Sequence, residues 1–223
     1  MPLTRRIIPF VQFLEQNIFN MHFDLAQAQR HLSQADPVLT SILARHGPCT
    51  LRPQRQYFVA LAEAILSQQL SVKAAATIFK RFKEKLGGRV APENILDLTD
   101  AQFRAAGVSR QKMAYLRDLA AKWQDGVIAH RRFAKMRDDE VIQALTQIKG
   151  IGRWTAEMFL IFSLMRPDVL PVDDLGFRKA LQIAYKLRKL PSPAKIEKIA
   201  ESWKPYRSIA TWYMWASLDN KPM

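Results

Sequence analysis

Apolar residues recur at helical spacing along almost the whole chain, and the alternating pattern typical of β-strands is nearly absent. One apolar face is clear in each of the segments 55–68, 72–86, 110–124 and 138–148. Residues 153–165 are apolar nearly all round, which predicts a central buried helix. The spacing therefore predicts an all-α fold of about ten helices.

Residues suited to capping mark several of the expected helix starts. Side-chain oxygens of Ser, Thr and Asp accept hydrogen bonds from the N–H groups of a first helical turn. Such residues precede apolar segments at Asp24, Asp36, Ser71, Thr99 and Ser109. The other helices that the spacing predicts are 24–33, 36–46, 174–187, 193–202 and 205–218.

The composition excludes several classes of protein. The net charge of +14 favours a polyanionic partner, with nucleic acid first and an acidic membrane surface second. The single cysteine, Cys49, excludes a disulfide framework and a multi-cysteine metal or iron–sulfur site. The four histidines have no ligand spacing, so we do not expect a metal enzyme. No apolar run reaches the length of a transmembrane helix, about 18 residues, and we expect no signal peptide.

A Gly-Ile-Gly turn at residues 150–152 lies between two helical segments. Glycines let a backbone approach closely, and the unpaired N–H groups at the start of the following helix favour an anion. Arg153 adds positive charge beside them. The turn is therefore suited to a phosphodiester, although a plain helix–helix turn uses glycine in the same way. Further along, Asp173 and Asp174 place two carboxylates at the start of another helix.

These residues carry a resemblance to a known family. Residues 145–156, with Leu145, Ile148, Gly-Ile-Gly and Thr-Ala, followed by Pro-Val-Asp-Asp at 171–174, resemble the helix-hairpin-helix DNA glycosylase superfamily. Within it, Ile-Leu-Ser-Gln-Gln-Leu-Ser-Val and Trp-Lys-Pro-Tyr-Arg-Ser resemble the 3-methyladenine DNA glycosylase II branch. The resemblance implies one glycosylase domain over residues 23–218, with two helical lobes and the active-site cleft between them. Residues 1–22 would then be an N-terminal extension.

The resemblance also implies a catalytic aspartate at the start of the helix after the hairpin. The register from Trp154 and the pattern Asp-Leu-Gly-Phe favour Asp174, and Asp173 then caps the helix or supports the site. A carboxylate there stabilises the oxocarbenium character of the sugar and activates water. Bifunctional relatives carry a Schiff-base lysine where this chain has Trp154, so we expect hydrolysis without a lyase step.

An enzyme of this family turns the damaged base out of the duplex and fills the gap. By resemblance, the side chain that intercalates is Gln69, with Leu70 as the second choice. The everted base, which is electron-poor, should stack on an aromatic surface. The residues expected to form its pocket are Trp215, Trp154 and Met158, the last of which replaces a tyrosine of some relatives.

The expected contacts with the DNA backbone centre on the hairpin. They are Gly150, Gly152, Arg153, Trp154, Thr155 and Lys73. Further basic candidates for phosphate contacts are Arg110, Lys112, Arg178 and Lys179. As in relatives, the main-chain carbonyls expected to hold a monovalent Na⁺ or K⁺ are those of Thr146, Ile148 and Ile151.

The function implied is that of a monofunctional DNA glycosylase of base excision repair, which hydrolyses the N-glycosidic bond of alkylated purines. 3-Methyladenine is the first expected substrate and 7-methylguanine the second. We expect no required cofactor, double-stranded DNA with a damaged base as partner, no membrane association, and a monomer. The place of action would be the cytoplasm or nucleoid in a bacterium and the nucleus in a eukaryote. Two alternatives remain: a glycosylase for an etheno, deaminated or oxidised base, and a non-catalytic DNA-binding protein.

Overall fold

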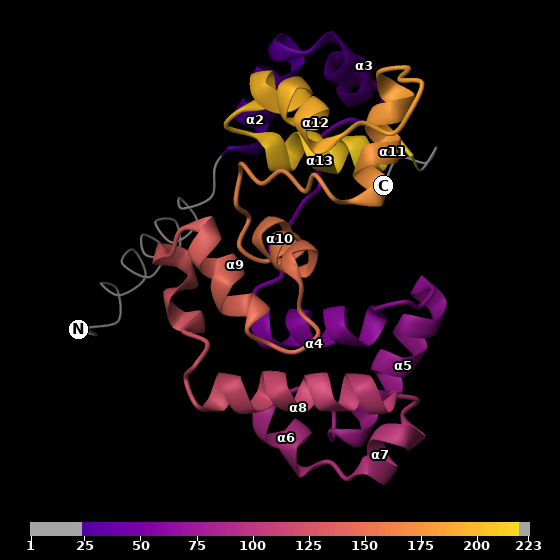
Figure 1. The fold of residues 1–223 in the computed structure, drawn as a ribbon, viewed down its shortest axis with the longest axis vertical. Helices are drawn as coiled ribbons and strands as arrows, with labels where there is room; N and C mark the ends of the chain where they lie inside the picture. Colours follow the sequence, from indigo (N-terminus) through magenta and orange to yellow (C-terminus); the bar gives the residue numbers. More distant parts are fainter. Residues whose placement is uncertain (1–23, 219–223) are drawn as a thin grey trace, which may run out of the picture. The chain divides into compact units, whose positions relative to one another are not determined.

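The computed structural model describes residues 24–218, so the expected N-terminal extension, residues 1–22, lies outside the described residues. Between residues 24 and 218 the chain forms twelve α-helices and two 3₁₀ helices and no β-strand (Figure 1). The all-α prediction is confirmed. The chain divides into two compact units, which we call unit 1 (residues 1–50 and 175–223) and unit 2 (residues 51–174).

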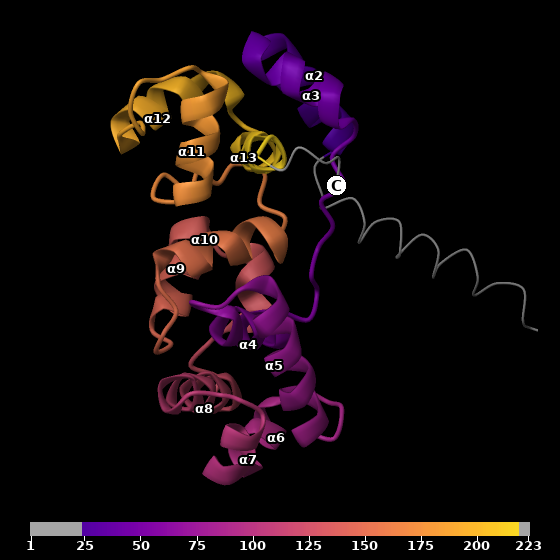
Figure 2. The same cartoon turned by 90° about the vertical axis from the view of Figure 1, so that its right-hand side faces the viewer.

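Unit 2 is built from one continuous stretch of chain. Its elements are α4 (Tyr57–Ser67), α5 (Val72–Lys85), α6 (Pro92–Asp97), α7 (Asp100–Ala105), α8 (Arg110–Gln124), η2 (His130–Lys135), α9 (Asp138–Thr146) and α10 (Arg153–Phe162). Helix α8 packs between α4 and α6, and α4 also contacts α5 and α10 (Figures 1 and 2). Apolar side chains of α4 and α8, such as Ile65 and Leu116, are fully buried in this core.

Helix α10 confirms the prediction of a buried helix over most of its length. Ala156, Phe159, Leu160 and Ile161 are buried. The helix ends at Phe162 rather than at residue 165, because the chain then turns and Met165 adopts a left-handed φ of 53°. Its two ends are exposed, at Trp154 near the N-terminus and at Phe162.

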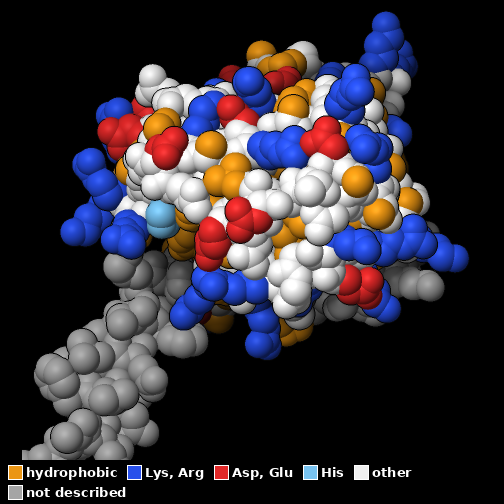
Figure 3. All heavy atoms as spheres, turned by 90° about the horizontal axis from the view of Figure 1, so that it is seen from below, with side chains coloured by type: hydrophobic (Ala, Val, Ile, Leu, Met, Phe, Trp, Pro, Cys, Tyr) orange, Lys and Arg blue, Asp and Glu red, His pale blue; other side chains and the backbone are white. Residues whose placement is uncertain are grey.

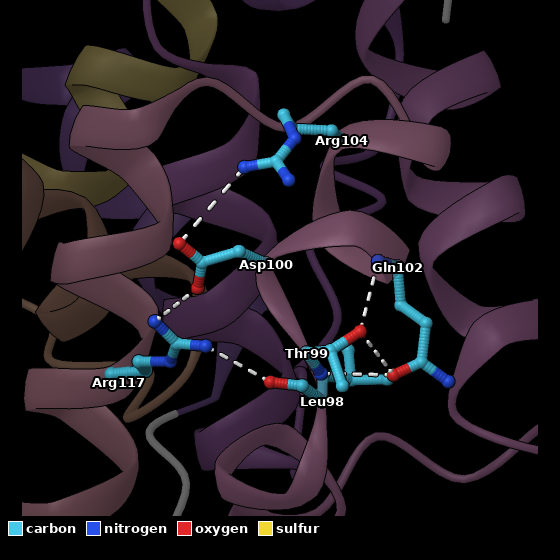
Figure 4. Close-up of polar contacts among 6 residues, drawn as sticks. All are labelled: Leu98, Thr99, Asp100, Gln102, Arg104 and Arg117. Carbon is cyan, nitrogen blue, oxygen red and sulfur yellow. Dashed lines mark hydrogen bonds and ion pairs between the residues drawn. The ribbon is translucent and has the colours of Figure 1, made fainter.

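The predicted capping residues are confirmed. The side chains of Asp24, Asp36, Ser71, Thr99 and Ser109 each accept a hydrogen bond from a first-turn N–H group. At Thr99 the cap is reciprocal, because the Gln102 side chain accepts from the Thr99 N–H (Figure 4). Next to it, Asp100 forms an ion pair with Arg117 of α8, so the short helix α7 is anchored to a long one (Figure 4).

Unit 1 combines the two ends of the described chain. Its elements are α2 (Leu25–Ala35), α3 (Pro37–His46), α11 (Leu175–Ala184), α12 (Pro193–Ala200), η3 (Glu201–Trp203) and α13 (Arg207–Ala216). Helix α13 is buried along almost its whole length and contacts α2, α3 and α11. Trp212 and Tyr213 of α13 are part of this core.

A buried aspartate ties the first helices of unit 1 to the later ones. Asp36 caps α3 by accepting from the N–H of Val38 at 2.8 Å. Its other carboxylate oxygen accepts from Trp203 Nε1 at 2.9 Å and from the Tyr185 hydroxyl. Burial and the Asp36 charge raise the pKa of Tyr185 far above its usual range, so this hydroxyl remains a donor at every physiological pH.

Candidate functional site

The two residues expected at the chemical centre, Trp154 and Asp174, are in direct contact. Trp154 Nε1 donates a hydrogen bond to Asp174 Oδ2 at 2.8 Å. The indole is 48% exposed, and Asp174 is half-buried in a turn closed by its N–H to the Pro171 carbonyl at 3.0 Å. Asp173 is more exposed than Asp174. The oriented carboxylate at this position is therefore that of Asp174, and the indole fixes its direction.

A third carboxylate lies close by, and the sequence reading did not identify it. Glu157 is only 4% exposed and accepts a hydrogen bond from Arg153 Nε at 2.9 Å. Burial raises the pKa of the Glu157 carboxyl, Arg153 lowers it in part, and the charges of Asp173 and Asp174 raise it further. One signal was available: a lone acidic residue within an apolar helix, four residues after an arginine. Arg153, expected to contact DNA, also has this partner within the protein.

The Gly-Ile-Gly hairpin requires glycine at its first position. Gly150 has a φ of 83°, and a Cβ there would lie 2.1 Å from Tyr115 Cδ2. Gly152 is different, with a φ of −94° and open space where a Cβ would point. Gly152 is the N-cap of α10, and it has no side chain to accept hydrogen bonds from the N–H groups of the first helical turn. Thr155 can contribute only its main chain here, because its side chain is buried.

Three side chains of helix α8 contact the hairpin and the residues just before it. The Tyr115 ring covers Gly150, Asp118 accepts from the Lys149 N–H at 2.8 Å, and Lys122 Nζ donates to the Gln147 carbonyl at 2.6 Å. Lys122 and Asp118 also form an ion pair at 2.8 Å. Burial alone would raise the pKa of Asp118, but its hydrogen bonds and the lysine charges outweigh burial and lower it.

The expected intercalating residues lie in the turn between α4 and α5. Gln69 has a left-handed φ of 57° and is exposed, as is Leu70. Ser71 then caps α5, and Lys73 is exposed in the first turn of that helix. The face drawn in Figure 3 carries many lysine and arginine side chains with fewer acidic ones between them. The positions of Gln69, Leu70 and Lys73 are compatible with the roles expected for them.

Two of the expected phosphate contacts have other partners. Lys112 Nζ donates to the main-chain carbonyls of Leu66 and Gln68, both at 2.7 Å. This ammonium therefore already has partners within the protein, and its contact with phosphate stays a prediction. Partial burial of the Lys112 ammonium lowers its pKa. Arg178 Nε donates to the Pro191 carbonyl at 3.2 Å. Residue type and charge suggested both assignments, but neither reveals a main-chain acceptor that lies nearby only in the folded chain.

The three residues expected to form the base pocket are not gathered in one described cavity. Met158 lines a mainly apolar cavity of about 440 Å³ between α4, α5 and α10, together with Ala64, Ser67 and Phe79. Among the described residues, neither Trp154 nor Asp174 lines this cavity. Trp215 is half-buried on α13 in unit 1. The pocket of Trp154, Met158 and Trp215 stays a prediction.

The carbonyls expected to hold a monovalent cation lie at the hairpin. The Ile148 carbonyl accepts a hydrogen bond from the Ile151 N–H at 3.0 Å, and Thr146 is the last residue of α9. Residues 24–218 contain no group of three or more His, Cys, Asp or Glu side chains placed to hold a metal ion. None of the helices in this range has the length and hydropathy needed to cross a bilayer.

The fold and this arrangement define a class of protein. Residues 62–205 match the model of the HhH-GPD superfamily of base excision DNA repair proteins, and the chain belongs to this superfamily.

Named relatives and solved structures support the same branch. DNA-3-methyladenine glycosylase 1 of Schizosaccharomyces pombe is 39% identical over 197 residues, covering 86% of each chain. DNA-3-methyladenine glycosylase of Saccharomyces cerevisiae is 34% identical, covering 84% of this chain and 78% of the relative. A structure of the S. pombe 3-methyladenine DNA glycosylase with abasic DNA has a TM-score of 0.76 at 37% identity. It covers 88% of this chain and 100% of that one.

Proposed function

We propose that the protein is a monofunctional DNA glycosylase of base excision repair that hydrolyses the N-glycosidic bond of alkylated purines in double-stranded DNA. 3-Methyladenine is the first substrate and 7-methylguanine the second. The named relatives that it resembles over most of its length support the reaction type. The observation that carries the mechanism is the hydrogen bond from Trp154 to Asp174, which aims a carboxylate without providing an amine.

The reaction needs little from the protein at the base. A purine methylated at N3 or N7 is cationic, so the C1′–N bond breaks with its electron pair going to a base that becomes neutral. Positive charge then develops on the sugar, and the Asp174 carboxylate stabilises it. A water molecule adds to C1′ and gives a proton to the carboxylate, which leaves an abasic site. Because Trp154 has no amine, the route contains no Schiff base and no strand cleavage.

The DNA contacts divide between the hairpin and the turn after α4. The N–H groups at the start of α10 bind a phosphate, with Gly152 leaving room for its approach and Arg153 and Lys73 adding charge. Gln69 fills the gap left by the everted base, with Leu70 beside it. Trp154, Met158 and Trp215 form the pocket, and Asp173 supports the site.

Further features of the proposal concern ions and assembly. The carbonyls of Thr146, Ile148 and Ile151 hold Na⁺ or K⁺, which would stabilise the hairpin without taking part in the reaction. No cofactor is required, and the enzyme acts as a monomer. Its substrate places its work at the nucleoid in a bacterium or in the nucleus of a eukaryote.

One assay tests this function. The purified protein is incubated with duplex DNA carrying single 3-methyladenine, 7-methylguanine, ethenoadenine, uracil or 8-oxoguanine lesions, and base release is measured. We expect release of the methylated purines first, no strand nicking before alkaline treatment, and no adduct after borohydride. Preferred release of another base would reassign the substrate, and a borohydride-trapped adduct would refute the hydrolytic route. Binding without release of any base would leave a non-catalytic DNA-binding protein.

A further inference from the structure

The turn that carries the expected intercalating residue is in a strained conformation. Gln69 has a φ of 57°, in the left-handed region that residues other than glycine rarely occupy. Such a residue persists only when its surroundings hold it there. Within the turn itself, the Leu70 N–H donates to the Ser67 carbonyl at 3.2 Å, which is a weak local restraint. Contacts from outside the turn must therefore supply the rest.

Lys112 of α8 is the first of these contacts. Helix α4 ends at Ser67, and carbonyls at a helix C-terminus lack partners within the helix. Lys112 Nζ donates to two of them, on Leu66 and Gln68, each at 2.7 Å. The ammonium thus binds the main chain directly before Gln69 and neutralises the negative end of the α4 dipole.

Gln68 is the second contact, and it reaches across to the hairpin. Its side-chain Nε2 donates to the Gly150 carbonyl at 2.7 Å, a contact between residues 82 positions apart in the sequence. The acceptor is itself fixed, because Gly150 lies against the Tyr115 ring of α8. Lys112 and Tyr115 are one turn apart on that helix, so α8 holds the Gln69 turn and the hairpin at the same time.

We propose that Lys112 and Gln68 are positioning residues that keep the Gln69 turn in fixed register with the Gly150–Gly152 hairpin. The phosphate-binding backbone and the side chain that fills the gap then meet the duplex as one rigid body. This inference rests on the proposed function. The hairpin binds any duplex, whereas the Gln69 turn gains contacts only where a base has left the stack. The two positioning residues therefore govern discrimination between gapped and intact DNA rather than overall affinity.

The test compares binding to two duplexes that differ at one nucleotide. One contains a tetrahydrofuran abasic analogue, and the other is undamaged. We expect Gln68→Ala and Lys112→Met to weaken binding of the abasic duplex about tenfold and to change binding of the undamaged duplex less than about twofold. Lys198→Met, on the exposed face of α12, is the matched loss of a lysine and should weaken both duplexes equally and slightly. Equal losses on both duplexes for Gln68→Ala would overturn the proposal.

A double-mutant cycle separates positioning from a general effect on the fold. In the background Gln69→Ala, the change Gln68→Ala should cost little further affinity for the abasic duplex, because the residue it positions is already gone. Additive losses would contradict the inference, as would an unchanged abasic preference in Gln69→Ala alone. Thermal unfolding identifies any variant that fails to fold. If Lys112→Met does not fold, the binding data for Gln68→Ala alone test the proposal. Failure of the proposed function would appear elsewhere, as absence of base release by the unaltered protein.

Discussion

Each unit contains a tryptophan whose indole N–H binds an aspartate, and the two pairs differ in how far they are buried. In unit 1, Trp203 and Asp36 are 0% and 7% exposed and lie 2.9 Å apart. In unit 2, Trp154 is 48% exposed and donates to Asp174 at 2.8 Å. The bond lengths are nearly the same, so geometry alone does not distinguish structure from function. Accessibility separates the two pairs, because a sugar can reach only a carboxylate that the protein does not fully enclose, and Asp174 is half-buried whereas Asp36 is buried.

We expect the largest effect when Asp174 of the exposed pair loses its charge but keeps its hydrogen bond to Trp154. Asp174→Asn keeps an acceptor for Trp154 but removes the negative charge. We expect base release to fall about 10²–10³-fold, the usual size for the loss of one transition-state contact, with unfolding free energy changed by less than about 0.5 kcal/mol. Single-turnover base release and chemical denaturation measure the two quantities. Asp173→Asn is the matched control, and a larger loss there would move the catalytic role to Asp173.

The buried pair should give the opposite result. Asp36→Ala removes the cap of α3 and leaves the Trp203 indole and the Tyr185 hydroxyl without their acceptor. We expect the free energy of unfolding to fall by about 3 kcal/mol, combining a lost cap with unsatisfied buried donors. Base release per folded molecule should stay within about threefold of the unaltered protein. A selective loss of release at full stability would break the comparison.

The same contrast can be tested within the hairpin. Gly150→Ala would force a Cβ against Tyr115 at a positive φ, and we expect it to cost about 2 kcal/mol or more of stability. Gly152→Ala meets open space at a negative φ and should change stability by less than about 0.5 kcal/mol. Its cost should appear as weaker binding of duplex DNA, measured by fluorescence anisotropy. Equal destabilisation by both changes would show that Gly152 is also structural.

The smallest expected effect concerns the support under the hairpin. Asp118→Asn should lower stability by about 1 kcal/mol at pH 7, because the charge that binds Lys122 and the Lys149 N–H is lost. The pKa of Asp118 is lowered on folding, so its contribution is complete above the ordinary value of 3.8. It disappears as the pH falls through the lowered value. Denaturation curves at several pH values should therefore converge for the two proteins in acid, and a constant difference would contradict this account.

The sequence predicted local features well. Helix positions followed from apolar spacing, and their starts from capping residues, since both depend on residues a few positions apart. The Gly-Ile-Gly turn and the pair of aspartates were noticed from their residue types, and the family resemblance together with the register from Trp154 favoured Asp174. Resemblance to a family supplied the rest of the assignment.

What the sequence did not reveal depends on contacts between distant residues. Gln68 and Gly150 are 82 positions apart, and nothing in their local pattern links them. In the sequence, nothing sets three residues of the amphipathic helix α8 apart from their neighbours: Tyr115, Asp118 and Lys122. Only the folded chain shows that they contact the hairpin region. The acceptors of Lys112 were missed for the same reason, since both carbonyls lie at the end of another helix.

The split composition of unit 1 has a consequence for synthesis. Among the helices of residues 24–218, α2 and α3 are made first, and the α13 helix on which they pack is made last. All of unit 2 is translated in between, as a continuous segment with its own core. Nascent chains therefore pass through a stage in which unit 2 can fold while the apolar faces of α2 and α3 still lack their partner. Translation arrest before Arg207 should leave the apolar faces of α2 and α3 without α13 to cover them, and chaperones bind exposed apolar surface of this kind.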